Sequence, residues 1–359
     1  MWKRGEWGIK VSVLAIACVC GDIAHAQSSV NLYGLVDGGL LYTSKTLNET
    51  TGQNAGHQFS MIDSGSAPSQ FGLMGTEDLG GDLRVKFKLE SGISVANGGF
   101  NDSNGNLFGR QAWVALASRY GQVTAGLQFS PFFLSQYETD ARGFSQFGSG
   151  LVTYIDNAIS TGIFNSNGIS YASPNVAGFQ GSAMLALGGE AGNFQAGRQY
   201  SVSLKYETGG LLVSAAFYDG NSGGTVQTPV PTTVPFIGRT IGASYKFGIV
   251  AAKVAFVNYK VAGSFNNYIY SGGLDCYVTP QFDLNGGVYY TTDRGHSENH
   301  SIMGAIGAQY FISKRTALYS QLGVVNNHGS MDTGLSVSNA LFGVQGTTVG
   351  ADIGIRHTF

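Results

Sequence analysis

The sequence predicts an all-β protein, a transmembrane antiparallel β-barrel of about sixteen strands with a long loop folded into its lumen. Three observations support this prediction. Runs of about ten residues alternate apolar and polar side chains between turn residues, which is the pattern of outer-membrane strands. No apolar run of about 18 residues or more follows residue 26, which argues against helical membrane spans. Charged residues form only 12% of the chain, about half their usual share in a soluble domain.

The first 26 residues have the three parts of a secretory signal peptide. A short apolar core (11–20) leads to a small-residue cleavage pattern that ends at Ala26. The positive region before and beside this core consists of Lys3, Arg4 and Lys10. We expect cleavage of 1–26, and we expect 27–359 to form one barrel domain. Lipid attachment at Cys18 is an alternative, but the leucine expected three residues before the cysteine is missing.

The composition left after cleavage excludes several classes of site. The predicted mature chain has 17 basic and 20 acidic residues, a net charge near −3. This charge argues against nucleic-acid binding, which usually requires a strongly basic surface. Cys276 becomes the only thiol, so a disulfide or a cysteine metal site within one chain is excluded. The histidines are scattered, and no cofactor is predicted.

The strands can be followed along the chain in order. Alternation is cleanest in 83–90, where four apolar residues alternate with Arg84, Lys86, Lys88 and Glu90. In a barrel the charged face lines the lumen and the apolar face meets lipid. The predicted strands are 31–41, 70–78, 83–90, 108–118, 122–129, 168–173, 179–187, 200–208, 211–218, 240–247, 250–259, 268–277, 282–292, 302–312, 317–325 and 348–359.

The connections between these strands differ in length in the way that outer-membrane barrels show, with short periplasmic turns and long external loops. The short connections are 79–82, 119–121, 174–178, 209–210, 248–249, 279–281 and 313–316. The long ones are 43–56, 97–105, 220–238, 293–299 and 326–346. Because an unpaired strand edge in lipid leaves backbone groups unsatisfied, we expect the last strand to pair with the first.

One segment, 130–165, has no period of its own. It is rich in aromatic residues, which argues against disorder, and a structureless connection of this length is usually functional. Its few charges are Glu138, Asp140, Arg142 and Asp156. We therefore expect it to fold against the inner wall of a wide barrel and to narrow the bore.

Four motifs resemble the general diffusion porins of betaproteobacterial outer membranes. They are SQFGLMGTEDLGG (69–81), LFGRQAWVALAS (107–118), ISYASPNVAGF (169–179) and the ending IRHTF (355–359). The resemblance implies a sixteen-stranded barrel, a homotrimer, and a third loop folded into the pore at 130–165. It also implies an outer-membrane channel, in contact with lipid and lipopolysaccharide, through which small hydrophilic solutes and ions diffuse passively.

The charged residues suggest how such a pore is lined. We expect Arg84, Lys86, Lys88 and Arg110 to form the basic side of the constriction, facing Glu138, Asp140 and Asp156, with Arg142 beside them on the loop. The alternative is that these charges belong to ordinary solvated faces or pair within the loop. Relatives commonly have basic residues where this chain has Gln70, Met74, Leu127, Phe164 and Ser170. The sequence therefore predicts weak ion selectivity, near neutral or slightly cationic.

Other functions remain as alternatives to a general diffusion channel. A barrel enzyme of the phospholipase type needs serine and histidine paired on the outer wall of neighbouring strands, and the predicted strands offer no such pair. A plugged structural barrel is disfavoured, because barrels of about sixteen strands usually leave an aqueous channel. A substrate-specific channel stays open, since one scaffold hosts both kinds. We predict a channel without enzymatic activity.

Overall fold

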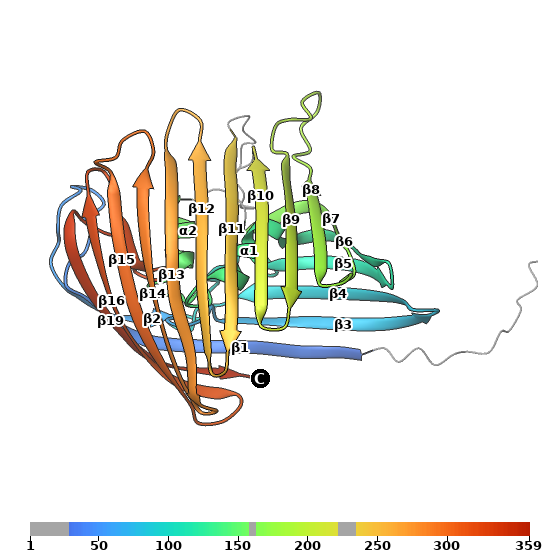
Figure 1. Ribbon diagram of the computed structural model, residues 1–359, viewed down its shortest axis with the longest axis horizontal. Coiled ribbons are helices and arrows are strands. Elements are labelled where there is room, and N and C mark those ends of the chain that lie inside the picture. The colour runs from blue at the N-terminus through green and yellow to red at the C-terminus, as the bar shows by residue number, and fades with distance from the viewer. Residues whose placement is uncertain (1–28, 158–162, 222–234) are drawn as a thin grey trace, which may run out of the picture.

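The computed structural model describes residues 29–157, 163–221 and 235–359, and it forms one antiparallel sheet that closes into a barrel of sixteen strands (Figure 1). The predicted fold class is confirmed. The predicted signal peptide, 1–26, lies outside the described residues.

All sixteen predicted strands are present, with ends that shift by a few residues. The first eight strands of the wall are β1 (Ser29–Thr43), β3 (Gln70–Gly80), β4 (Leu83–Gly92), β5 (Gln111–Ser118), β6 (Gly121–Phe129), β7 (Phe164–Ala172), β8 (Phe179–Ala186) and β9 (Gln199–Thr208). The other eight are β10 (Leu211–Gly220), β11 (Phe236–Phe247), β12 (Val250–Val261), β13 (Asn266–Thr279), β14 (Phe282–Asp293), β15 (His300–Phe311), β16 (Thr316–His328) and β19 (Gly346–Thr358).

The barrel closes where β1 pairs with β19, in a register that runs from Leu35↔Thr358 to Thr43↔Gly350. This pairing confirms the closure that the sequence predicts. On its other edge β1 pairs first with β3 and then with the short strand β2 (Gln58–Asp63), which the sequence did not predict. The buried carboxylate of Asp37 holds the turn between β2 and β3, because it accepts the backbone N–H groups of 65–67 and the Tyr319 hydroxyl.

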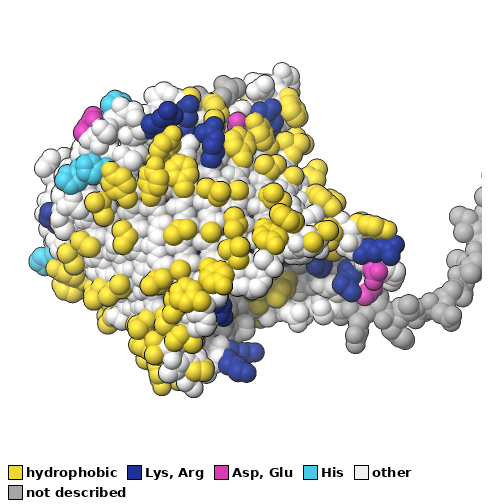
Figure 2. Space-filling model, viewed as in Figure 1, with side chains coloured by type: hydrophobic (Ala, Val, Ile, Leu, Met, Phe, Trp, Pro, Cys, Tyr) yellow, Lys and Arg dark blue, Asp and Glu magenta, His cyan; other side chains and the backbone are white. Residues whose placement is uncertain are grey.

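The two faces of the wall differ as a membrane requires. Apolar side chains on the outer face are exposed, and they include Leu32, Val114, Val254, Leu274, Ile306 and Leu322. Figure 2 shows hydrophobic side chains spread over one outer face, with charged groups gathered toward its ends. The inner face has buried polar groups such as Ser201, Ser214, Asn258 and Gln321. Neither helix of the described part of the chain is long and apolar enough to cross a membrane.

The segment 130–165 contains two short helices, α1 (Pro131–Thr139) and α2 (Gly150–Asn157), so the prediction that it lacks regular structure is wrong. Local capping explains α1: the Ser130 hydroxyl accepts the Phe133 N–H, and Pro131 occupies the first turn, where its missing N–H costs nothing. The helical period is hidden because α1 buries both apolar and polar residues, including Phe132, Ser135 and Gln136. A small hairpin, β17 (Thr333–Ser336) with β18 (Ala340–Phe342), lies within the long connection 326–346.

Wall glycines let this segment lie directly on the inner face. A Cβ on Gly242 of β11 would stand 2.6 Å from Thr139, and one on Gly323 of β16 would stand 2.9 Å from Phe147. A Cβ on Gly238 would likewise collide with the ring of Phe132. Inward side chains at these positions would hold the segment away from the wall, which explains part of the high glycine content of 54 residues. In Figure 1 both helices lie within the curve of the wall.

Replacing Gly242 by valine is expected to push α1 away from β11 and toward the bore, so ion conductance falls while the barrel stays folded. Overpacking of this kind costs about 1–3 kcal/mol. Single-channel recording measures the effect. Gly272→Val is the matched control, because a Cβ on Gly272 makes its nearest contacts at 3.7 Å, an ordinary packing distance. Equal conductance in the two variants would contradict the tight contact between α1 and the wall.

Candidate functional site

Helix α1 is held against the inner face of β9–β12 by an aromatic cluster and by hydrogen bonds. The ring of Phe132 is fully buried and lies 6.0 Å from Tyr218 and 6.2 Å from Tyr259, centroid to centroid. Two polar contacts join the same surfaces: the Phe132 N–H donates to Ser201 Oγ at 3.0 Å, and the Ser135 and Ser214 hydroxyls are 2.7 Å apart. These contacts fix which face of α1 remains free toward the bore.

Asp140 locks the chain that follows α1. Its carboxylate accepts the backbone N–H groups of Arg142, Phe144 and Gly150 at 2.8–2.9 Å, and it accepts the Tyr289 hydroxyl of β14 at 2.8 Å. Hydrogen bonds to a charged group contribute about 1.5–3 kcal/mol each. In addition, Lys253 of β12 donates to the Asp140 carbonyl at 2.9 Å. Asp140 is therefore an anchor of the segment on the wall rather than a charge open to the bore.

A cavity of about 480 Å³, the main cavity, lies between α1 and the wall β4–β10. Lys88 of β4, Glu138 of α1 and Lys205 of β9 all line it. Its charges are paired: Lys205 Nζ is 2.8 Å from Glu138 Oε1, and Lys88 Nζ is 3.0 Å from Glu90 Oε2. The remaining polar lining includes glutamine, serine and threonine side chains.

A second cavity, of about 470 Å³, lies next to the first on the side of the short turns. The two share Gln122 and Gln180 in their linings. Arg84 and Lys86 line this second cavity. Arg84 Nε is 3.6 Å from Asp78 Oδ2, and Lys86 Nζ donates to Gln122 Oε1 at 3.2 Å.

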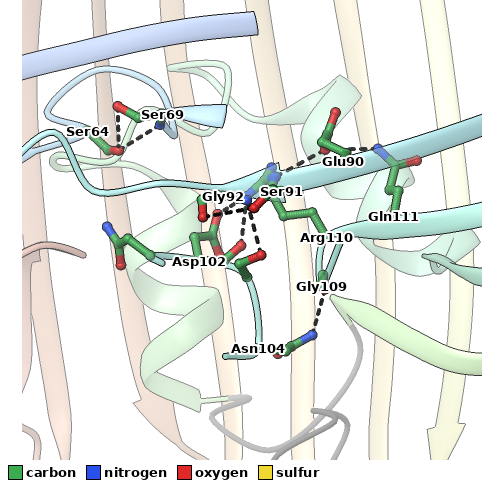
Figure 3. A network of polar contacts seen from close by, with 12 residues as sticks. Ser64, Ser69, Glu90, Ser91, Gly92, Asp102, Asn104, Gly109, Arg110 and Gln111 are labelled. Carbon is green, nitrogen blue, oxygen red and sulfur yellow. Dashed lines mark hydrogen bonds and ion pairs between the residues drawn. The ribbon is translucent and has the colours of Figure 1, made fainter. Parts of the chain in front are cut away.

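Arg110 lies in a polar network beside the main cavity and lines neither cavity itself (Figure 3). Its guanidinium is buried and pairs with Glu90 at 3.0 Å and, at closer range, with Asp102 of the loop between β4 and β5. Gln111 donates to the same Glu90 carboxylate at 3.1 Å. Glu90 thus joins β4 and β5 to this loop, and the structure does not bring Arg110 to Glu138, Asp140 or Asp156.

The last two predicted residues also make contacts that hold the segment in place. Arg142 donates to Gln321 of β16, and Asp156 Oδ2 accepts the Thr333 hydroxyl of β17 at 3.1 Å. The predicted set therefore divides in three. Lys88 and Glu138 share the main cavity, and Arg84 and Lys86 line the second. The third group lines neither cavity and contains Arg110, Asp140 and Arg142, which are buried, and Asp156, which is half-buried.

Comparison with known proteins identifies the family. Residues 12–330 match the Gram-negative porin family. The chain belongs to this family. It is 30% identical to outer membrane porin protein 32 of Delftia acidovorans, over 98% of this chain and all of that protein. It is 27% identical to an outer membrane porin protein of Bordetella pertussis, again over 98% of this chain and all of that protein.

A solved structure agrees with these relatives. The anion-selective porin from Comamonas acidovorans superposes with a TM-score of 0.80 at 26% identity, over 93% of this chain and all of that one. The protein is thus an outer-membrane porin, and its barrel forms a channel. The alternative of an outer-membrane enzyme is not favoured, because these relatives are porins.

Three residues that shape the porin's lumen were missed by sequence reasoning. Lys205 lies in the alternating run 200–208, and Lys253 lies in the alternating run 250–259. Neither lysine belongs to a motif that would mark it as a residue of the lumen. Trp113 lies within the motif 107–118, which predicts a strand there but no role in the lumen. Alternation alone places all three on the inner face, and their contacts with the segment 130–165 or the main cavity depend on the register between strands.

The contact of α2 with the hairpin β17–β18 is expected to weaken as the pH rises. Burial, together with the nearby Asp332 carboxylate, raises the pKa of Asp156 to about 7. Because the folded carboxyl holds its proton more tightly than an unfolded one, it stabilises this contact below about pH 4, and the stabilisation is lost as the pH rises through about 7.

Hydrogen exchange of the α2 amides, corrected for intrinsic rates, measures this loss between about pH 5 and about pH 8. Asp156→Asn cannot ionise, so its protection should stay level over that range. Parallel pH profiles in the two proteins would contradict the prediction.

Proposed function

We propose that this porin is a passive diffusion channel for small hydrophilic solutes and ions, and that its narrowest section lies between α1 and the wall β4–β8. The cavity lined by both α1 and this wall supports the position. The free face of α1 carries Glu138 toward the bore, and Lys205 of β9, on the wall beside α1, pairs with it at 2.8 Å. The segment 130–165 then limits the size of the solutes that pass, and the paired charges determine the electric field in the bore.

We propose that ion selectivity is weak because the charges that line the main cavity are paired. Lys88 and Lys205, the two lysines of the main cavity, each face a carboxylate within 3.0 Å. Each pair acts as a dipole whose field falls off faster than that of a single charge, and salt screens the remainder within about 8–10 Å. The net field along the bore is therefore small, and neither cations nor anions gain a large local excess.

A planar bilayer with a tenfold KCl gradient tests this proposal through the reversal potential. We expect single channels with a potential near zero. The similar structure from Comamonas acidovorans is described as anion-selective. A strong anion preference in this porin would show that Arg84, Lys86 or Lys88 acts as an unpaired charge at the narrowest section. Absence of any channel activity would overturn the diffusion role itself.

We further propose that the porin assembles as a homotrimer through the outer faces of β1 and β19. Leu32 and Leu40 of β1 are 64% and 60% exposed, and Ile353 of β19 lies opposite Leu40 and is 53% exposed. The other outer faces then meet lipid and lipopolysaccharide. Unheated detergent electrophoresis should show a band near three chains that collapses on boiling. A monomer in native mass spectrometry from mild detergent would count against the trimer. The proposal includes no enzymatic step and no cofactor.

A further inference from the structure

Trp113 is one of the wall aromatic residues that line the main cavity. It is the only tryptophan outside the predicted signal peptide. Aromatic residues of outer-membrane barrels usually gather in girdles on the outer face, at the two membrane interfaces. The neighbours of Trp113 on β5, Val114 and Leu116, are exposed on that outer face, whereas Trp113 itself lines the main cavity. The single indole of the mature protein therefore faces the bore.

The positions beside this indole on the next two strands are glycines. Trp113 lies opposite Lys88 on one side and Gly126 of β6 on the other, and Gly126 lies opposite Gly168 of β7. Gly126 has φ +126°, and a Cβ there would collide with the Ala112 carbonyl, so no larger residue fits without a backbone shift. The Gln128 amide lies over these two glycines and donates to both of their carbonyl oxygens at 3.2 Å, so the cavity lining here is a neutral amide rather than a bulky or charged side chain.

The ring is also held in place. Trp113 Nε1 donates to Gln111 Oε1 at 3.0 Å, and Gln111 Nε2 donates to the buried Glu90 carboxylate at 3.1 Å. Because Glu90 is in turn fixed by Arg110, the indole orientation is set by the network of Figure 3. A fixed ring loses little freedom when a ligand stacks on it.

Around this platform the cavity offers neutral hydrogen-bonding groups. Gln122, Gln128, Ser170, Ser182 and Ser203 line it, and some of them already bond to one another, as Ser170 does to Gln128 at 2.5 Å. Amides and hydroxyls both donate and accept, as the hydroxyls of a sugar do. The lysines of the cavity are paired with carboxylates, so the lining does not select for charge. The volume of about 480 Å³ is typical of small-molecule sites.

We propose that the bore of this porin binds neutral polyhydroxylated solutes, such as hexoses, at Trp113. The apolar C–H face of the sugar ring stacks on the indole, and the hydroxyls exchange hydrogen bonds with the glutamine and serine side chains around it. This inference rests on the proposed diffusion function, since the solute must pass through an open bore. It names a solute class for that bore and a residue that slows the solute there.

The first test is block of the ion current in planar bilayers by added glucose. We expect a saturable fall in conductance beyond the fall caused by viscosity alone. Trp113→Ala should raise the glucose concentration needed for half-maximal block by about tenfold, and Trp113→Phe should raise it less. Tyr120→Ala, which removes an exposed ring outside this cavity, is the control and should behave as the native porin.

The second test uses the intrinsic fluorescence of Trp113 in the folded, detergent-solubilised porin. Glucose should change its emission with the same half-saturation as the current block. Gluconate, an anion of matched size, should bind more weakly than glucose.

Three outcomes overturn the inference: block that grows only with viscosity, block unchanged in Trp113→Ala, or stronger block by gluconate. Each of them leaves the ion conductance of the native porin intact and so does not touch the proposed diffusion function. If Trp113→Ala does not fold, the native fluorescence titration and Trp113→Phe still decide the question.

Discussion

Deletion of residues 136–149 is expected to raise the single-channel conductance severalfold and to admit larger sugars in liposome swelling. The deletion removes the second half of α1 with Glu138, which faces the main cavity, and it removes Asp140, which anchors the segment to Tyr289. Without these residues the wall β4–β8 no longer faces the second half of α1 across the bore. Because the resistance of an aqueous pore is concentrated at its narrowest section, widening that section has the largest effect on current.

The matched control is a deletion of 190–193, a stretch of exposed residues between β8 and β9. It shortens the chain at the rim and should leave conductance and the size limit unchanged. Heat-modifiable migration on electrophoresis shows whether each deleted barrel still folds. A folded 136–149 deletion with native conductance would mean that the middle of this segment does not form the narrowest section.

Met74→Arg is expected to shift the reversal potential clearly toward anions. Met74 lies opposite Lys88 in the register between β3 and β4, on the inner face, and its side chain is 41% exposed. The Glu90 carboxylate next to Lys88 already pairs with Lys88 and Arg110, so it is not free to neutralise an arginine at this position. It would add a single unpaired positive charge within about one Debye length of the paired lysines. The local anion concentration then rises along this part of the bore.

Met74→Gln is the control, since it changes the polarity of the side chain without adding charge. It should keep the native reversal potential in the same KCl gradient. Equal potentials for the arginine and glutamine variants would show that position 74 lies too far from the narrowest section to affect ions.

Local patterns in the sequence determined the wall of this porin. Alternation with a period of two decides which side chains face lipid and which face the lumen, and it depends only on neighbours along one strand. The sixteen runs therefore appear as β1, β3–β16 and β19. Closure of β1 on β19 was also predictable, because lipid tolerates no open edge.

The partners of the inward charges were decided only by the tertiary structure. Arg110 meets Glu90 from 20 residues away, Lys205 meets Glu138 from 67 residues away, and Tyr289 reaches Asp140 across 149 residues. Alternation tells that such a residue points inward, but its depth along the bore depends on strand register and on where the loops fold. Arg110, Asp140, Arg142 and Asp156 anchor the fold because only the folded barrel brings their hydrogen-bonding partners to them, and the first three are buried there.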